Sequence, residues 1–105
     1  VFNEDVCVTA IRSIRERYRE GELRERLARY HGANTDCAFW GWCDAWLAPG
    51  FRSWNLEHYL PSIDLPWLVV QGADDDYGTL AQVDAIEAGA SGDCQRFIPE
   101  GCRHA

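Results

Sequence analysis

The stretch Leu65–Thr79, LPWLVVQGADDDYGT, decides the fold that we predict for this chain. Its apolar run between Pro66 and Gly72 predicts a fully buried strand. Three aspartates follow the glycine, and Thr79 stands before a segment whose apolar residues have helical spacing. This order of strand, acidic turn and helix brings an acidic side chain past the carboxyl end of a strand in an α/β protein.

The residues after this stretch complete a strand–helix–strand unit, which we assign to residues 63–105. The spacing predicts a helix from Thr79 to about Gly89, and Gln95–Ile98 predicts a second short strand that Pro99 ends. A strand, a helix and a strand in succession form a parallel βαβ unit. Two strands are too few for an independent sheet. We therefore expect the helical half, another chain or the rest of a larger fold to cover it.

The residues before this stretch predict a helical, aromatic-rich region over residues 1–62. Apolar spacing predicts a helix capped by Asn3 that carries Val6–Tyr18, and a second that carries Leu23–Tyr30 and ends at Gly32. A third helix, capped by Asn34 or Thr35 and stopped by Pro49, carries Phe39–Leu47, and a further short aromatic helix covers Phe51–Leu60. We expect the inward faces of the first two helices to carry Val6, Ala10, Ile11, Ile14, Tyr18, Leu23, Leu27 and Tyr30.

Composition and charge narrow the classes of function. At 105 residues, with 47% apolar and 26% charged residues, the chain is typical of a single globular domain. Its net charge of −7 argues against nucleic acid or an anionic membrane as a partner. No apolar span approaches the roughly 18 residues that a transmembrane helix needs. The five cysteines are odd in number and form no C-x-x-C motif, so we expect reduced thiols in a cytoplasmic protein.

Two residues beyond the predicted strands form a candidate acid–base pair. Asp75 follows the first strand, and His104 follows the second through a turn at Pro99–Gly101. Because neighbouring parallel strands end at the same edge of a sheet, we expect these side chains to meet. A carboxylate on Nδ1 of an imidazole fixes its tautomer, as a base that activates a nucleophile requires. The alternative is a solvated acidic turn in which Asp76 or Thr79 caps the next helix.

The segment 66–79, together with the turn 101–104, resembles the C-terminal part of an α/β-hydrolase. In that superfamily the triad occurs in the order nucleophile, acid, histidine. The acid commonly stands three residues after the glycine that ends its strand, which here is Asp75, and the histidine commonly follows the last strand, which here is His104. Arg103 stands where the family usually has glycine. The resemblance implies an α/β fold with a helical cap before a βαβ unit.

The resemblance implies a bacterial hydrolase of the ester, thioester or carbon–carbon type, with His104 as general base and Asp75 as its orienting acid. The nucleophile motif G-x-S-x-G does not occur in the chain. The nearest segment, Gly89–Gly92, follows a helix and precedes a strand, which is the reverse of the required order. Cys102 is disfavoured as a substitute, because residues of one turn rarely converge. We therefore expect a serine upstream of Val1 as nucleophile and no appreciable turnover from this chain alone.

The predicted cap carries more aromatic side chains than its packing requires. The resemblance implies that some of them line an acyl or aromatic-substrate pocket beneath the cap. The alternative function is a non-catalytic homo-oligomeric module that binds an apolar or aromatic small molecule. We expect no cofactor and no metal, because His31, Cys37 and Cys43 match no zinc spacing. The candidate substrate-binding residues are Phe39, Trp40, Trp42, Trp46 and Trp54.

Overall fold

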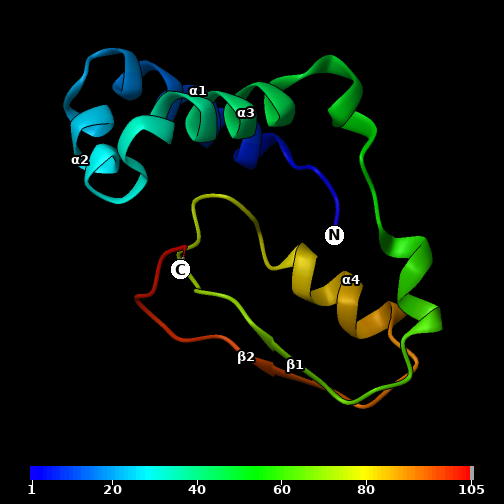
Figure 1. Cartoon of the computed structure of the whole chain (residues 1–105). Helices are drawn as coiled ribbons and strands as arrows, with labels where there is room; N and C mark the ends of the chain where they lie inside the picture. Colours follow the sequence, from blue (N-terminus) through cyan, green and yellow to red (C-terminus); the bar gives the residue numbers. More distant parts are fainter. Residues whose placement is uncertain (105) are drawn as a thin grey trace.

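The computed structural model describes residues 1–104 and combines helices with a small parallel sheet. Helices α1 (Asp5–Arg19), α2 (Glu22–His31) and α3 (Thr35–Leu47) form the helical half of the molecule. The 3₁₀ turn η1 (Gly32–Asn34) joins α2 to α3. Figure 1 shows this half on one side of the molecule, with the strands on the other and the N-terminal segment between them.

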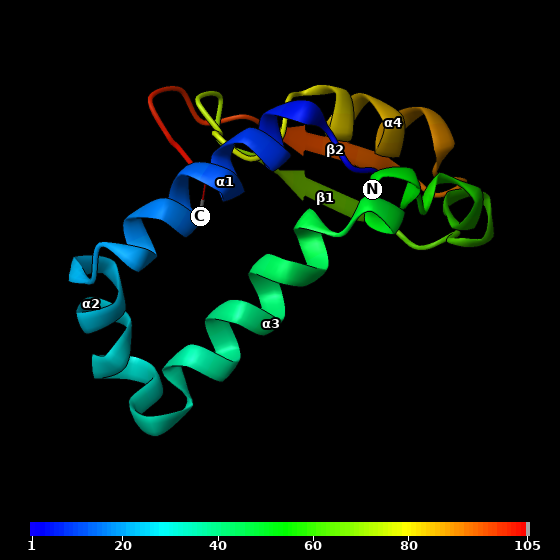
Figure 2. The ribbon, with the colours of Figure 1, turned by 90° about the horizontal axis from the view of Figure 1, so that it is seen from above.

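The second half is the predicted strand–helix–strand unit. Strand β1 (Trp67–Val70) pairs in parallel with β2 (Cys94–Phe97), and helix α4 (Ala81–Gly89) connects them. The register runs from Trp67 opposite Cys94 to Val70 opposite Phe97. The prediction of a parallel pair with an intervening helix is thus confirmed, and the ends of both strands lie at one edge of the sheet (Figure 2).

The core of the helical half is built around two stacked aromatic rings. Tyr18 and Phe39 lie with their ring centroids 3.6 Å apart, almost parallel. The Tyr18 hydroxyl donates to Asp36 at 2.7 Å, and Arg24 binds the same carboxylate through two nitrogens at 2.8 and 2.7 Å. These bonds hold the pKa of Asp36 well below its usual range. They also join α1, α2 and α3. The buried cluster consists of Cys7, Ile11, Tyr18, Phe39 and Cys43.

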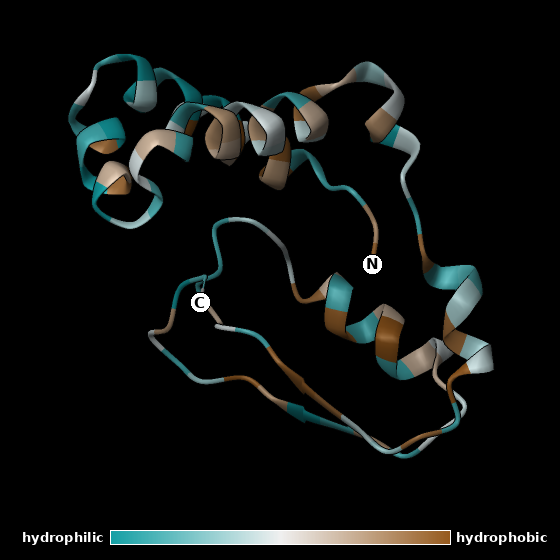
Figure 3. Ribbon diagram, viewed as in Figure 1, coloured by the Kyte–Doolittle hydropathy of each residue, from teal (hydrophilic) through white to brown (hydrophobic). Residues whose placement is uncertain are grey.

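Strand β1 is not the fully buried strand that its apolar run predicts. Trp67 and Val69 are half-buried, but Leu68 and Val70 are 67% and 58% exposed. Helix α4 packs against β2, and none of residues 1–104 covers the face that carries Leu68 and Val70. Figure 3 shows β1 as a hydrophobic segment at an open side of the molecule. The prediction of full burial is therefore wrong for the described residues, because the apolar pattern does not report which element supplies the cover.

The short helix predicted over Phe51–Leu60 is also wrong. This segment forms two 3₁₀ helices, η2 (Pro49–Ser53) and η3 (Glu57–Ser62), separated by extended residues. Asn55 in this break forms an antiparallel bridge with Phe2. Backbone pairing with the N-terminal segment thus competes successfully with helix formation at this point.

Two predicted inward positions lie elsewhere. Val6 is 36% exposed, and its neighbours Cys7 and Val8 are buried in its place. Tyr30 is 85% exposed, because it lies in the last turn of α2, past the point where Leu23 and Leu27 of this helix reach the core. Within residues 1–104, no helix has the length and apolar character needed to cross a membrane. The cytoplasmic location stays a prediction.

Candidate active site

The loop after β1 and the loop after β2 are joined along their backbones. The N–H of Ala73 donates to the carbonyl of Pro99 at 3.1 Å, and the N–H of Asp74 donates to the carbonyl of Cys102 at 2.9 Å. Gly72 permits this approach, because a Cβ atom at this position would lie 2.3 Å from the Cys102 carbonyl oxygen. The glycine that ends the strand is therefore needed for the contact between the two loops.

Beyond these backbone bonds, the side chains of Asp75 and His104 meet. Nδ1 of His104 lies 3.0 Å from each carboxylate oxygen of Asp75. The Asp75 side chain is 10% exposed, whereas that of His104 is 54% exposed. With Nδ1 engaged as donor, Nε2 is the ring nitrogen left for a reacting group. A carboxylate in this position holds the imidazole in one tautomer and stabilises its protonated form.

The surroundings of the pair favour a charged carboxylate and a fixed ring. Burial raises the pKa of Asp75, but hydrogen bonds from His104 and from the backbone N–H of Tyr77, the latter at 2.7 Å, together lower it below its usual value. Asp75 is therefore ionised at neutral pH. The ring of Tyr77 lies beside that of His104, with centroids 4.7 Å apart. Tyr77 thus contacts both members of the pair.

The other two aspartates of the turn are placed differently. The guanidinium of Arg103 forms an ion pair with the carboxylate of Asp76 at 2.6 Å, and both side chains remain substantially exposed. Asp74 is exposed, and its contact to the neighbouring loop is made by its backbone. Arg103 forms this ion pair and does not line the cavity that His104 lines. Asp75 is the acid of this turn whose side chain reaches His104.

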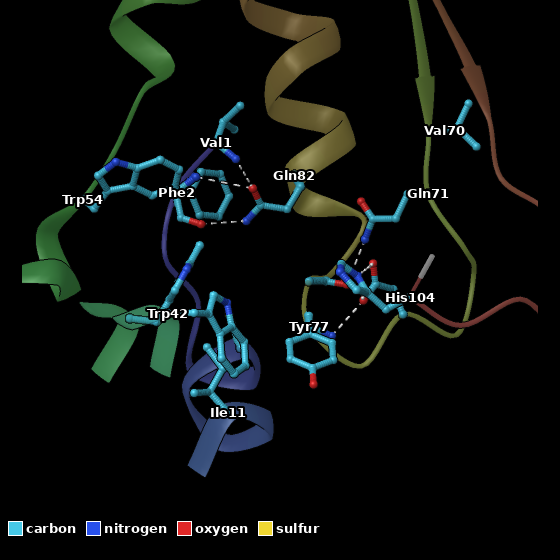
Figure 4. A pocket seen from close by; sticks show the side chains of 14 residues that line it. Val1, Phe2, Ile11, Trp42, Trp54, Val70, Gln71, Tyr77, Gln82 and His104 are labelled. Carbon is cyan, nitrogen blue, oxygen red and sulfur yellow. Dashed lines mark hydrogen bonds and ion pairs between the residues drawn. The ribbon is translucent and has the colours of Figure 1, made fainter. Parts of the chain in front are cut away.

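A cavity of about 520 Å³ adjoins the pair (Figure 4). This volume lies within the usual range of small-molecule sites, which is roughly 300–1,000 Å³. The helical half supplies an apolar wall, and the strand half supplies neutral amides and the acid–histidine pair. The cavity is lined by Val1, Phe2, Cys7, Ile11, Trp42, Trp46, Trp54, Val70, Gln71, Asp75, Tyr77, Gly78, Gln82 and His104.

The aromatic residues predicted to bind substrate fall into two groups. Phe39 is 5% exposed and stacks on Tyr18 in the helical core. Trp40 stands edge-on to Phe39, with ring centroids 5.1 Å apart. These two residues pack within the helical half and are not part of the cavity wall. The predicted residues that do line the cavity are Trp42, Trp46 and Trp54.

Several polar residues around the site were not singled out from the sequence. Nε2 of Gln71, the residue directly after β1, donates to the carbonyls of Gly78 and Thr79 at 2.8 and 3.1 Å. The Glu4 carboxylate accepts from the backbone N–H and the hydroxyl of Thr79, and from Gln82. The position of Gln71 after a strand was a usable signal. Glu4 gave none, because 75 positions separate it from Thr79.

The alternative interpretation of the acidic turn predicts a cap for the next helix at Asp76 or Thr79. The hydroxyl oxygen of Thr79 accepts the N–H of Ala81, the first residue of α4, at 3.2 Å. Thr79 therefore satisfies one of the free amides at the start of this helix. Glu4 adds a negative charge at the same helix end, which the helix dipole favours.

A nucleophile is not evident in the described part of the chain. No serine of residues 1–104 lines the cavity. Cys7 does line it, but burial, with smaller contributions from Glu4 and Asp75, raises the pKa of this thiol and keeps it protonated. Cys102 is exposed and lies outside the cavity wall. The described residues also contain no group of three or more His, Cys, Asp or Glu side chains arranged to hold a metal.

Comparisons with protein-family models, with curated proteins and with solved structures gave no match to this chain. The relationship to α/β-hydrolases therefore stays a prediction, which depends on the motifs of the sequence and on the geometry of the site.

Proposed function

We propose that this chain supplies the acid and the histidine of a hydrolase active site of the α/β-hydrolase type, acting on an ester, thioester or carbon–carbon bond. The observation that carries the proposal is the bond between Nδ1 of His104 and the largely buried carboxylate of Asp75, beside an apolar cavity. The nucleophile in this proposal is a serine from residues upstream of Val1.

In the proposed reaction, Nε2 of His104 takes the proton of the serine hydroxyl as the serine attacks the substrate carbonyl. Asp75 stays ionised and stabilises the imidazolium that forms. His104 then returns the proton to the leaving group. The limited exposure of Asp75 strengthens its interaction with the imidazolium, because charges interact more strongly where water is largely excluded.

The open side of the sheet supports a nucleophile from further residues. β1 pairs with β2 along one edge, and the described residues place no strand on its other edge. Leu68, Val70 and Phe97 leave an apolar face uncovered. Additional parallel strands would pair with the open edge of β1. The helices that connect such strands would cover this apolar face. Strands in that position would end beside the cavity, where a serine after one of them would face His104.

The cavity wall favours an uncharged apolar or aromatic substrate group. Trp42, Trp46 and Trp54 offer aromatic faces. The amides of Gln71 and Gln82 on the polar side are neutral, and their N–H groups are bonded within the chain. Asp75 is the ionised side chain of this wall, and it is already paired with His104. A charged substrate group at the tryptophans would lose its hydration without gaining a partner.

The test uses the chain extended by its upstream coding sequence, which we expect to encode a strand followed by G-x-S-x-G. A fluorophosphonate that labels activated serines should react with the extended protein. Labelling should fall about a thousandfold in His104→Ala, since the serine loses its base. Asp74→Asn is the matched control for Asp75→Asn, and only the latter should slow labelling.

Two results would overturn the proposal. One is an upstream sequence without such a serine. The other is serine labelling that proceeds equally in His104→Ala. A burst of p-nitrophenol from the 105-residue chain alone, abolished by His104→Ala, would contradict the external position of the nucleophile while supporting the role of His104.

The second candidate function is a homo-oligomeric module that binds an apolar small molecule. The exposed apolar face of the sheet and the tryptophan-lined cavity favour it. Two measurements separate the candidates. If the chain is such a module, sedimentation should show an oligomer, and thermal unfolding should show that an apolar ligand raises its stability. A folded monomer whose stability does not respond to such ligands would contradict it.

A further inference from the structure

A second cavity, of about 330 Å³, lies among the three long helices. Its wall is mainly apolar: Ile14 comes from α1, Leu23 and Leu27 from α2, and Ala38 and Phe39 from α3. Its polar side chains are His31 and Thr35, and no carboxylate or guanidinium belongs to its wall. The cavity is therefore suited to an uncharged hydrocarbon group.

This second cavity shares part of its wall with the cavity beside His104. Trp42 and Tyr77 line both. Tyr77 also contacts the His104 ring, so its removal would disturb the acid–base pair. Trp42 makes no such contact. In Figure 4, Trp42 and Ile11 lie on one side of the first cavity and Tyr77 lies across from them.

The position of Trp42 along α3 explains how one side chain reaches both cavities. Phe39 lies in the wall of the second cavity and Trp46 lies in the wall of the first. Trp42 stands between them, one turn from each. A helix rises about 1.5 Å per residue, so α3 carries these three rings past both cavities over roughly 10 Å. Trp42 packs edge-on against Phe39 with centroids 5.8 Å apart, and the described residues give its indole no hydrogen bond.

From this shared wall we propose that Trp42 is a specificity-determining residue, which limits how long an aliphatic chain the cavity beside His104 accepts. A straight uncharged chain whose polar end lies at His104 extends along the tryptophans and stops at the Trp42 ring. Without that ring, the chain continues into the second cavity among the helices. The inference rests on the proposed function, because it treats the cavity beside His104 as the substrate site.

The test is calorimetric titration of the chain with straight-chain primary alcohols from butanol to decanol. Each methylene that enters an apolar cavity should strengthen binding roughly fourfold. For the wild type, we expect the gain to stop at an intermediate length. In Trp42→Ala the gain should continue over several further methylenes, so that the longest alcohols bind at least tenfold more tightly than to the wild type.

Trp54→Ala is the matched control, since Trp54 lines the first cavity and not the second. It should weaken binding of all alcohols by a similar factor and leave the limiting length unchanged. Circular dichroism establishes that each variant is folded. If Trp42→Ala does not fold, Trp42→Leu replaces it, because leucine keeps an apolar contact in a smaller volume.

Three results would overturn the inference. They are no alcohol binding to the wild type, an unchanged limiting length in the folded Trp42 variant, and an equal shift of that length in Trp54→Ala. Alcohol binding requires no nucleophile and no proton transfer. The outcome of the alcohol titration is therefore distinguishable from that of the serine-labelling test.

Discussion

The helical half and the strand half of this molecule bury their apolar side chains in different ways. In the helical half, α1 and α3 enclose Ile11 and Cys43 almost completely, at 1% and 0% exposure. In the strand half, Val83 of α4 is fully buried, but the sheet face that carries Leu68 and Phe97 stays exposed. One half thus completes its own core, and the other completes only one side of its sheet.

This difference bears on the site, because the acid and the histidine belong to the less complete half. Their loops are held by backbone bonds to each other. They are also held by contacts from the helical half, where Glu4 binds Thr79, and Tyr77 packs against the buried cluster of the helices. The position of the pair thus depends on both halves, and predictions that treat them separately test this account.

The largest contrast should come from two phenylalanines. Phe39→Ala removes a 5% exposed ring from the helical core and should cost about 3 to 5 kcal/mol in the free energy of unfolding. Phe97→Ala removes a 58% exposed ring and should cost less than about 1 kcal/mol. Urea denaturation measures both. A large loss in Phe97→Ala would mean that the sheet face is already covered, for example by a second copy of the chain.

A pair of glycines gives the next contrast. Gly72→Ala places a Cβ atom against the backbone of the Cys102 turn and should cost about 3 kcal/mol or more, since neither backbone segment can yield freely. Gly41→Ala on α3 meets no atom within 4 Å and should stabilise the protein by up to about 1 kcal/mol. Hydrogen exchange should show that the loss in Gly72→Ala is concentrated in the loops after β1 and β2. Equal stabilities of the two variants would contradict the close contact of these loops.

The acid–histidine pair predicts a dependence on pH. Because the pKa of Asp75 is lower in the folded state than in the unfolded one, its stabilising effect is complete above the unfolded pKa. It is lost as the pH falls through the folded pKa. Asp75→Asn should therefore cost about 1.5 to 3 kcal/mol at neutral pH, and this difference should shrink in acid. Denaturation at a series of pH values checks it, and a difference that stays constant with pH would contradict the assignment.

The smallest contrast concerns the polar contacts that flank the site. Glu4→Gln weakens the cap that the helical half places on α4 and should cost about 0.5 to 2 kcal/mol. Arg103→Ala breaks an exposed ion pair with Asp76 and should cost between about 0 and 1 kcal/mol. Thermal unfolding distinguishes them. A greater loss in Arg103→Ala than in Glu4→Gln would mean that the contact between the halves is not made through Glu4.

The sequence was sufficient to predict those features that depend on neighbouring residues and on the topology of one unit. The βαβ unit followed from apolar spacing, and the meeting of Asp75 with His104 followed from the rule that parallel strands end at one edge. Gly72 was visible as the end of a strand. Its close approach to the Cys102 turn depends on how the second loop folds back, and the sequence carries no sign of it.

The features that could not be predicted depend on distant segments. The exposure of Leu68 and Val70 depends on which elements cover a sheet face, and the apolar run is the same with or without them. The break between η2 and η3 depends on pairing of Asn55 with Phe2. Helical spacing places Phe39 and Trp42 on neighbouring positions of one face. Only the packing of α1 and α2 decides that Phe39 is buried in the core while Trp42 borders both cavities.

The most direct test of the account is the tautomer of His104, measured from the ¹⁵N chemical shifts of its ring at a pH where the imidazole is neutral. We predict the proton on Nδ1 in the wild type and in Asp74→Asn. In Asp75→Asn we predict its transfer to Nε2, because the carboxylate that holds it is gone. A wild-type ring protonated on Nε2, or a tautomer that Asp75→Asn leaves unchanged, would contradict the claim that Asp75 prepares His104 to act as a base.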